Sequence, residues 1–231
     1  MWRAVASGKS LVFGGEEEEK MEKAMVWIAW LLGAYLAGAV PFGFLIGKMR
    51  GVDGRTVGSK NIGATNVYRT VGKKWGLLAF LCDFLKGLVP VVLAQRFGGE
   101  AHLPLAVGLM TVVGHMFTCF MKFKGGKGIA TGFGMLVALT PVLVLVAFAV
   151  WVVVMLVSHY VSLGSIVAAA FLMVVVWLPW HDWFSCGMLR SCKGYHDLPL
   201  CILVTALCAF AIWKHKTNII RLRAHAESKI Y

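Results

Sequence analysis

Residues 122–132 have the composition of a phosphate-binding segment. They read Lys-Phe-Lys-Gly-Gly-Lys-Gly-Ile-Ala-Thr-Gly and lie just before an apolar run. A helix that begins there would present free backbone N–H groups and the positive end of its dipole to an anion. The segment is not a P-loop, because Met121 stands where that motif has its first glycine and Gly128 follows the lysine. We predict a phosphate site, with a basic membrane anchor as the alternative.

Residues 58–69 form a second candidate, Gly-Ser-Lys-Asn-Ile-Gly-Ala-Thr-Asn-Val-Tyr-Arg. Glycines allow concave backbone, while hydroxyls, amides and an arginine supply donors for an oxyanion. The alternative is a solvated loop that ends in a helix cap at Thr65 or Asn66.

A third segment, residues 158–166, contains hydroxyl groups but no Lys or Arg. Two interpretations remain open: the hydroxyls line a cavity at the membrane face, or they bond to carbonyls inside helices. Histidines adjoin these segments, since His115 precedes residues 122–132 and His215 stands three residues before Asn218. Either histidine is a candidate functional residue or a structural one.

Asp83 and Lys86 lie three residues apart in an apolar run, on one face of an expected helix. Charges inside a bilayer are costly and are usually paired or functional. We expect the two side chains to neutralise each other, with contact between Lys86 and a substrate as the alternative.

The composition identifies the class of protein. Of 231 residues, 59% are hydrophobic and 15% charged, yet the net charge is +12. This hydrophobicity excludes intrinsic disorder, and six cysteines are too few for a small disulfide scaffold. Nucleic-acid binding would not explain the long apolar runs. We predict an all-α, polytopic membrane helix bundle.

Seven apolar runs are candidate transmembrane helices, since about 20 apolar residues cross a bilayer. They are residues 24–47, 75–97, 101–121, 129–139, 141–157, 161–180 and 198–213. With the N-terminus outside, the loops after the first and third runs and the C-terminal tail hold seven, three and five of the 23 Lys and Arg residues. The positive-inside rule therefore predicts a cytoplasmic C-terminus.

The ends and cysteines complete the domain organisation. Residues 1–23 are expected to be a disordered tail or an over-long start, and residues 24–231 a single transmembrane domain. Residues 181–197 are expected to be an extracytoplasmic insertion, in which Cys186 and Cys192 are able to pair. No zinc-type spacing of His and Cys occurs, so we expect no metal site.

The three segments together resemble the motifs of one family, the integral-membrane acyl-phosphate:glycerol-3-phosphate acyltransferases of bacteria. Residues 58–69 resemble its first motif, residues 114–134 (glycine-histidine, then KFKGGKG) its second, and residues 161–166 its third. The resemblance runs from about residue 24 to the end of the chain. The chain departs from it at Lys60, where the family usually has glycine, and at Thr118, where it usually has proline.

The resemblance implies an enzyme with seven helices that transfers a fatty acyl group from acyl phosphate to the 1-hydroxyl of sn-glycerol 3-phosphate. The products would be lysophosphatidic acid and phosphate, in the first acylation of phospholipid synthesis. It implies no acyl-CoA or acyl carrier protein donor, no cofactor, no nucleic acid and no obligate protein partner. The enzyme would lie in the bacterial cytoplasmic (inner) membrane, with its active site facing the cytoplasm.

The motifs give candidate site residues for both substrates. For glycerol 3-phosphate these are Arg69, Lys127, Ser165, His215 and Asn218. For the acyl phosphate they are Ser59, Asn61, Gly63, Thr65, Asn66, Lys124, Gly125, Gly126 and Ser162. The candidate catalytic residues are Ser59, Lys127, His215 and Asn218.

A general base is hard to find among these residues. The loops expected inside offer only the carboxylates of Asp53 and Glu227, and neither lies in a motif. We expect a substrate phosphate oxygen to take the proton, with His115 or His215 as the alternative base. An acyl-enzyme on Ser59 or Ser162 is a rival mechanism, and a transporter of phosphorylated metabolites is the alternative function.

Overall fold

The computed structural model describes residues 9–178 and 198–230, with side chains from residue 15 onward. The described part is entirely helical and contains no strand. Its longer helices are α1 (Lys9–Ala39), α4 (Lys73–Phe97), α5 (Leu103–Met116), α6 (Ile129–Leu139), α7 (Pro141–Ser158), α8 (Val161–Val175) and α9 (Leu198–Lys214). Three short helices, α2 (Phe42–Met49), α3 (Ala64–Thr70) and α10 (Lys216–Arg223), and a 3-10 turn at Cys119–Met121 complete it. The predicted all-α class is confirmed.

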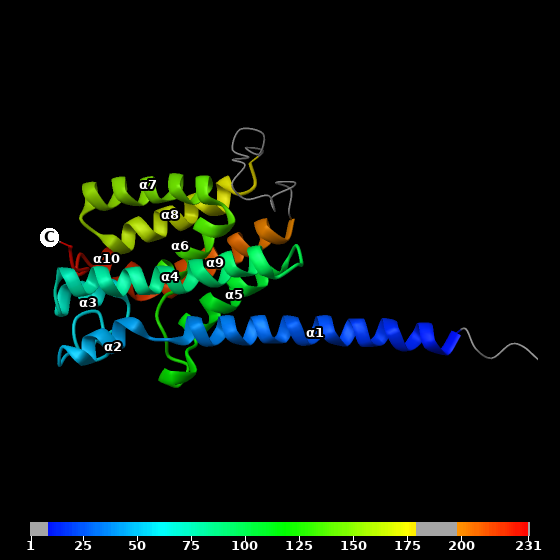
Figure 1. Cartoon of the computed structure of the whole chain (residues 1–231). Helices are drawn as coiled ribbons and strands as arrows, with labels where there is room; N and C mark the ends of the chain where they lie inside the picture. The colour runs from blue at the N-terminus through cyan, green and yellow to red at the C-terminus, as the bar shows by residue number, and fades with distance from the viewer. Residues whose placement is uncertain (1–8, 179–197, 231) are drawn as a thin grey trace, which may run out of the picture.

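Long helices side by side make up the bundle (Figure 1). α1 packs against α5, α4 lies between α5 and α6, and α8 packs between α7 and α9. Much of the outer surface is apolar, and Ile28, Leu77 and Val157 are 63–78% exposed. Such a surface suits lipid, and in lipid a helix satisfies its own backbone hydrogen bonds.

Four candidate spans in the described residues are long and apolar enough to cross a membrane, namely Gly15–Met49, Lys73–Phe97, Leu103–Met121 and Pro141–Ser158. A fifth is counted if α9 and α10, bent by 52°, form one span. α6 and α8 are apolar but shorter. The predicted boundaries of the runs at 75–97, 129–139, 141–157 and 198–213 agree with helix ends to within two residues.

The prediction of one continuous helix at residues 24–47 is wrong in one respect, because the helix is broken between α1 and α2. Pro41 supplies no N–H group, and α1 stops at Ala39. Two carbonyls at the break are satisfied from elsewhere. The Oγ1 atom of Thr118 donates to the Ala39 oxygen at 2.6 Å, and the Nζ atom of Lys86 to the Val40 oxygen at 2.7 Å.

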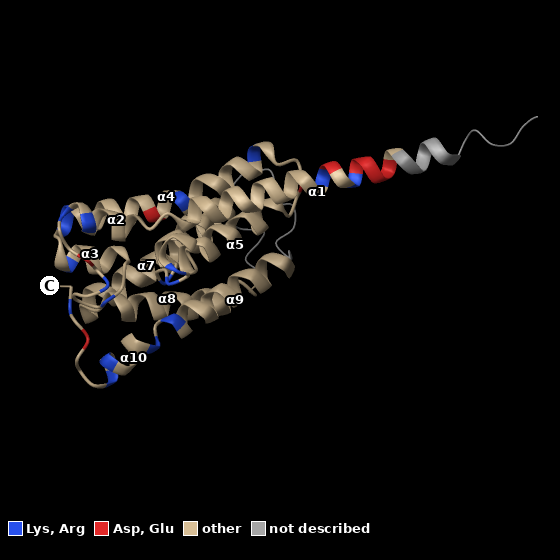
Figure 2. Ribbon diagram, turned by 90° about the horizontal axis from the view of Figure 1, so that it is seen from below, with Lys and Arg blue, Asp and Glu red and all other residues tan. Residues whose placement is uncertain are grey.

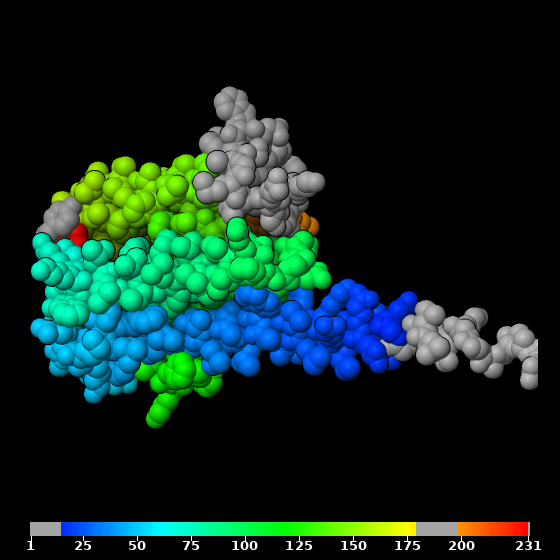
Figure 3. Space-filling view, viewed as in Figure 1, coloured from blue at the N-terminus to red at the C-terminus, as the bar shows by residue number. Residues whose placement is uncertain are grey.

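The N-terminal region also differs from expectation. Residues 9–23, expected within a disordered tail, continue α1 as helix, and Figure 3 shows α1 extending past the other helices. Within it Lys23 pairs with Glu19 at 2.7 Å, one turn away. The proposed insertion at residues 181–197, with Cys186 and Cys192, lies outside the described residues.

Charge is distributed unevenly along the bundle (Figure 2). Lys and Arg gather where α2, α3, α10 and the end of the described chain lie, opposite the projecting start of α1. This is the end at which the three candidate segments meet. The asymmetry agrees with the basic loops predicted from the sequence.

Glycines allow close approach of α4 and α6. A methyl carbon at Gly134 would lie 2.0 Å from the carbonyl oxygen of Phe84, and one at Gly87 would lie 2.0 Å from that of Thr131. Small residues at such crossings allow backbones to touch, a common arrangement in membrane helices. The crossing matters for the candidate site because residues 122–132, the glycine–lysine segment, lead into the start of α6.

Gly134→Ala is therefore expected to destabilise the protein, since the methyl group collides with backbone on α4. We expect a loss of about 1–3 kcal/mol, the usual cost of overpacking, seen as a lower melting temperature in detergent. Gly132→Ala is the matched control, because nothing lies within 4 Å of that position in the same helix. Equal melting temperatures for the two variants would contradict the close crossing.

Candidate active site

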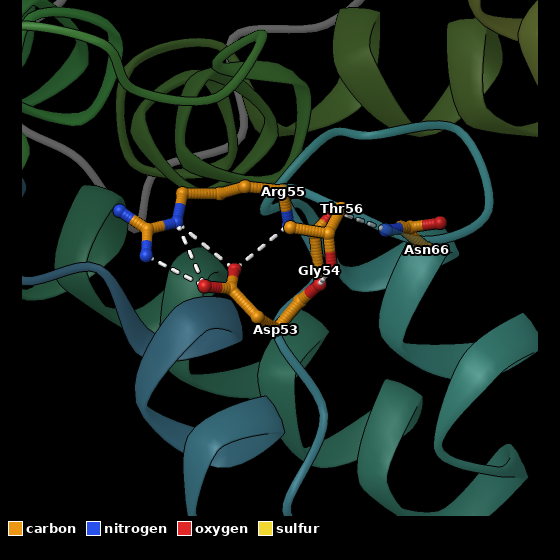
Figure 4. A network of polar contacts seen from close by, with 5 residues as sticks. All are labelled: Asp53, Gly54, Arg55, Thr56 and Asn66. Atoms are coloured by element: carbon orange, nitrogen blue, oxygen red, sulfur yellow. Dashed lines mark hydrogen bonds and ion pairs between the residues drawn. The ribbon is translucent and has the colours of Figure 1, made fainter.

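The loop after α2 is held by its own polar groups (Figure 4). The carboxylate of Asp53 accepts hydrogen bonds from the backbone and the guanidinium of Arg55, the shortest at 2.6 Å. Those bonds lower the pKa of Asp53 to about 2. Thr56 Oγ1 donates to the Asp53 carbonyl at 2.9 Å. Asp53 thus shapes the loop and is a poor candidate for a base.

Asn66 organises the first candidate segment from inside. It is 2% exposed, and its Nδ2 atom donates to the carbonyls of Gly54 and Val57 at 2.9 and 3.2 Å. Its Oδ1 atom accepts from the backbone N–H of Ser59 at 2.9 Å. The side chain predicted to bind acyl phosphate therefore stabilises the loop that presents Ser59.

Two more residues of this segment have local partners. The N–H of Gly63 donates to Asn61 Oδ1 at 2.9 Å, and Gly63 is the N-cap of α3 in place of the expected Thr65 or Asn66. Lys60, where the family usually has glycine, has a φ of 56°, in the region that favours glycine. The segment is thus a tightly folded turn.

The glycine–lysine segment folds back onto α5. Gly125 donates its N–H to the Met116 carbonyl and Gly126 to the His115 carbonyl, both at 3.1 Å. These two N–H groups are engaged with protein instead of standing free for an anion. Gly128, with φ 80°, is the N-cap of α6, so the predicted helix start at Ile129 is confirmed.

Lys127 reaches across to α10. Its Nζ atom lies 2.5 Å from the Oδ1 atom of Asn218, and the Nδ2 atom of Asn218 donates to Glu227 Oε1 at 2.7 Å. The same carboxylate oxygen accepts from the Oγ atom of Ser162 on α8 at 2.9 Å. Three predicted site residues from distant parts of the chain are therefore brought together by Glu227.

Two arginines complete this Glu227 cluster. Arg221 Nε lies 2.6 Å from Glu227 Oε2, and the Nη2 atom of Arg69 donates to the Ser228 carbonyl at 2.6 Å. The Nε atom of Arg69 is buried and has no hydrogen-bond partner among the residues that the structure describes. Burial would raise the pKa of Glu227, but the bonds from Arg221, Asn218 and Ser162 outweigh it and lower that pKa. Both oxygens of the carboxylate therefore have hydrogen-bond donors.

Two basic groups of the site, Lys127 and His215, have lowered pKa values. Burial, reinforced by Arg221 and Arg69, lowers the pKa of Lys127 to about 8, although Glu227 acts against the shift. Burial and nearby Lys127 lower the pKa of His215 to about 4. The Nδ1 atom of His215 lies 2.8 Å from the Ala211 carbonyl, which accepts a hydrogen bond from the ring N–H. His215 is therefore neutral near pH 7 and a weak base.

Other predicted residues lie further from this set or have different contacts. Ser165 bonds to the Val161 carbonyl at 3.0 Å and accepts from Trp151 Nε1 at 3.3 Å, and Lys124 is exposed. The central role of Glu227 was not predicted from the sequence. Its signal was a single carboxylate among the cations of the C-terminal tail.

Metal chemistry has no evident site in the part of the chain that the structure describes, where no three His, Cys, Asp or Glu side chains converge. The expected metal-free reaction stays a prediction. What the geometry does provide is cationic and amide donors around a buried carboxylate, suited to holding phosphorylated molecules.

Comparisons with known proteins identify relatives of this chain. Residues 28–225 match the model of the family described as glycerol-3-phosphate acyltransferase. A glycerol-3-phosphate acyltransferase of Trichlorobacter lovleyi is 45% identical over 87% of this chain and 95% of its own. One of Aquifex aeolicus is 42% identical over 85% of this chain and 95% of its own.

Two solved structures resemble the fold. Both are crystal structures of PlsY (YgiH), an integral membrane glycerol 3-phosphate acyltransferase, in glycerol 3-phosphate and lysophosphatidic acid forms. The TM-scores are 0.77 and 0.74, at 38% and 37% identity, and each comparison covers 88% of this chain and 94% of the other.

The pKa of Lys127 predicts the pH dependence of activity. A lysine with a lowered pKa is cationic below that value and loses its charge as the pH rises through about 8. We expect kcat/KM to fall above pH 8, approaching tenfold per pH unit, because this ratio reports groups of the free enzyme.

Lys127→Arg is the control, because a guanidinium keeps its proton throughout this range. Whatever activity that variant retains should lose the alkaline decline. A decline that persists unchanged in Lys127→Arg would assign it to another group.

Proposed function

This chain belongs to the glycerol-3-phosphate acyltransferase family, and on that premise we propose that its acyl donor is a fatty acyl phosphate. The observation that carries the proposal is the convergence of Lys127, Arg69 and Arg221 at one end of an apolar bundle. An acyl phosphate and glycerol 3-phosphate repel each other, and cations in a partly buried site offset that repulsion. The products are lysophosphatidic acid and phosphate.

We propose that seven helices span the bacterial cytoplasmic membrane, with the N-terminus outside and the C-terminus in the cytoplasm. Four long helices, one bent pair and two shorter apolar helices support the count. Gathering of Lys and Arg at the end that carries the Glu227 cluster supports a site facing the cytoplasm.

The two substrates divide the site between them. Arg69, Lys127, Ser165, His215 and Asn218 bind glycerol 3-phosphate, and the unpartnered Nε atom of Arg69 is available for its phosphate. The loop around Ser59 and the segment at Lys124 receive the acyl phosphate head, with its chain among the helices. Gly125, Gly126 and Asn66 act by shaping these loops, since their polar groups already have partners.

The reaction proceeds by direct attack. The 1-hydroxyl oxygen of glycerol 3-phosphate bonds to the acyl carbon, and the bond from that carbon to the phosphate oxygen breaks. The hydroxyl proton passes to a phosphate oxygen, so that no protein base is consumed. Lys127, which binds glycerol 3-phosphate and is also a candidate catalytic residue, additionally stabilises the departing phosphate. The lowered pKa values of His215 and Asp53 support this route, because both groups are weak bases near pH 7.

The donor is tested with purified protein, glycerol 3-phosphate and a long-chain acyl phosphate. We expect lysophosphatidic acid and phosphate in equal amounts, and none from acyl-CoA or an acyl carrier protein thioester. Lys127→Met should lower the rate at least a hundredfold, the scale of losing one charge-stabilising group. Lys23→Met, on the exposed start of α1, is the matched control with unchanged rate. Absence of product from acyl phosphate would refute the proposal.

Direct attack is tested by the mass of the intact protein after incubation with acyl phosphate alone. We expect no change, because no enzyme nucleophile takes the acyl group. Ser162 is the strongest rival nucleophile because it bonds to Glu227, but a carboxylate with a lowered pKa is a poor base. A mass gain of one acyl group, mapped to Ser59 or Ser162, would replace direct attack by an acyl-enzyme route.

A further inference from the structure

Three ionisable side chains that the reaction does not use lie together inside the bundle. Asp83 and Lys86 on α4 and His115 in the last turn of α5 are 2%, 7% and 7% exposed. Lys86 Nζ lies 2.8 Å from Asp83 Oδ1, which confirms the expected ion pair, and His115 Nδ1 lies 3.6 Å from the same oxygen. Buried charges are costly unless paired, so their place in a membrane helix calls for a role.

Lys86 connects the group of Asp83, Lys86 and His115 to the break between α1 and α2. Its Nζ atom donates to the Val40 carbonyl at 2.7 Å and lies 5.6 Å from the centre of the Phe42 ring. The break leads through α2 into the loop that presents Ser59. One end of the group therefore supports the first candidate segment.

His115 ties it to the glycine–lysine segment. The His115 carbonyl accepts the N–H of Gly126 at 3.1 Å, and the imidazole ring fills the space that a side chain at Gly126 would need. A methyl carbon there would lie 2.2 Å from His115 Nε2. Gly126 immediately precedes Lys127. The position of the His115 ring therefore determines the backbone position from which the Lys127 side chain extends.

We propose that Asp83 and His115 are positioning residues for Lys127, with Lys86 as the counter-charge of Asp83. The carboxylate of Asp83 faces Nδ1 and attracts its N–H, which turns the opposite edge of the ring onto Gly126. The contact is longer than a hydrogen bond, so it orients the ring electrostatically. The inference rests on the proposed function only in its assignment of Lys127 to glycerol 3-phosphate.

A rescue experiment tests the contact between His115 and Gly126. Gly126→Ala collides with the Nε2 edge of the imidazole and displaces the ring from its place beside Asp83, and we expect kcat/KM to fall at least tenfold. His115→Ala in that background makes room for the methyl group, so the double variant should recover at least threefold. A double variant no more active than Gly126→Ala would overturn the inference.

A second experiment tests Asp83 without leaving a lone buried charge. In the variant Asp83→Asn/Lys86→Gln both charges are removed together. We expect the KM for glycerol 3-phosphate to rise at least fivefold, because Lys127 loses its alignment. The melting temperature should stay close to that of the wild type. Unchanged KM would overturn the role of Asp83.

Gln95→Met is the matched control on the same helix. It removes a bond from Gln95 Nε2 to the Ala138 carbonyl, 3.0 Å long and about three turns further along α4 from Asp83. Wild-type kinetics are expected, and a loss equal to that of the double charge variant would show that any change to α4 suffices, contradicting the inference.

Calorimetric titration with glycerol 3-phosphate alone separates this inference from the identity of the donor. Binding needs no acyl donor, so weaker binding by Asp83→Asn/Lys86→Gln supports the inference even if acyl phosphate proves not to be the substrate. Equal binding by the variant and the wild type would contradict it, whatever the donor is.

Discussion

The buried carboxylate of Glu227 is the interaction on which the candidate site depends. It joins α8 through Ser162 and α10 through Asn218 and Arg221. A buried carboxylate costs several kcal/mol unless its oxygens are hydrogen-bonded, so these donors hold the C-terminal segment in place. Because Glu227 takes the amide nitrogen of Asn218, the amide oxygen faces Lys127. The carboxylate of Glu227 thereby determines where the ammonium group of Lys127 points, and we assign Lys127 to the substrate.

The membrane places a second constraint on the same architecture. The apolar helices present their outer surface to lipid, while the candidate site lies at the end of the bundle where Lys and Arg gather. At the break in the first span, two deeper carbonyls have side-chain donors: Thr118 for the Ala39 carbonyl and Lys86 for that of Val40. Gly87 and Gly134 allow the backbones of α4 and α6 to touch. This contact fixes the start of α6, where the glycine–lysine segment ends.

Patterns local to the chain could be predicted from the sequence. The helix at Ile129–Leu139 followed from its apolar run, and the pair of Asp83 and Lys86 from helical spacing. Contacts between distant segments could not. The partners of the Gly125 and Gly126 N–H groups depend on how the segment folds onto α5. Glu227 had no motif around it, and only tertiary folding shows that four parts of the chain meet there.

The most direct test is the affinity of Glu227→Gln for glycerol 3-phosphate, measured by calorimetry beside a melting curve. Asp53→Asn, which changes the other carboxylate at this end, is the comparison. If Glu227 organises the site, the variant binds at least tenfold more weakly, because the NH2 group of a carboxamide must face either Arg221 or the donors Asn218 and Ser162. Unchanged or tighter binding, as expected if Glu227 only repelled a substrate phosphate, would contradict this account.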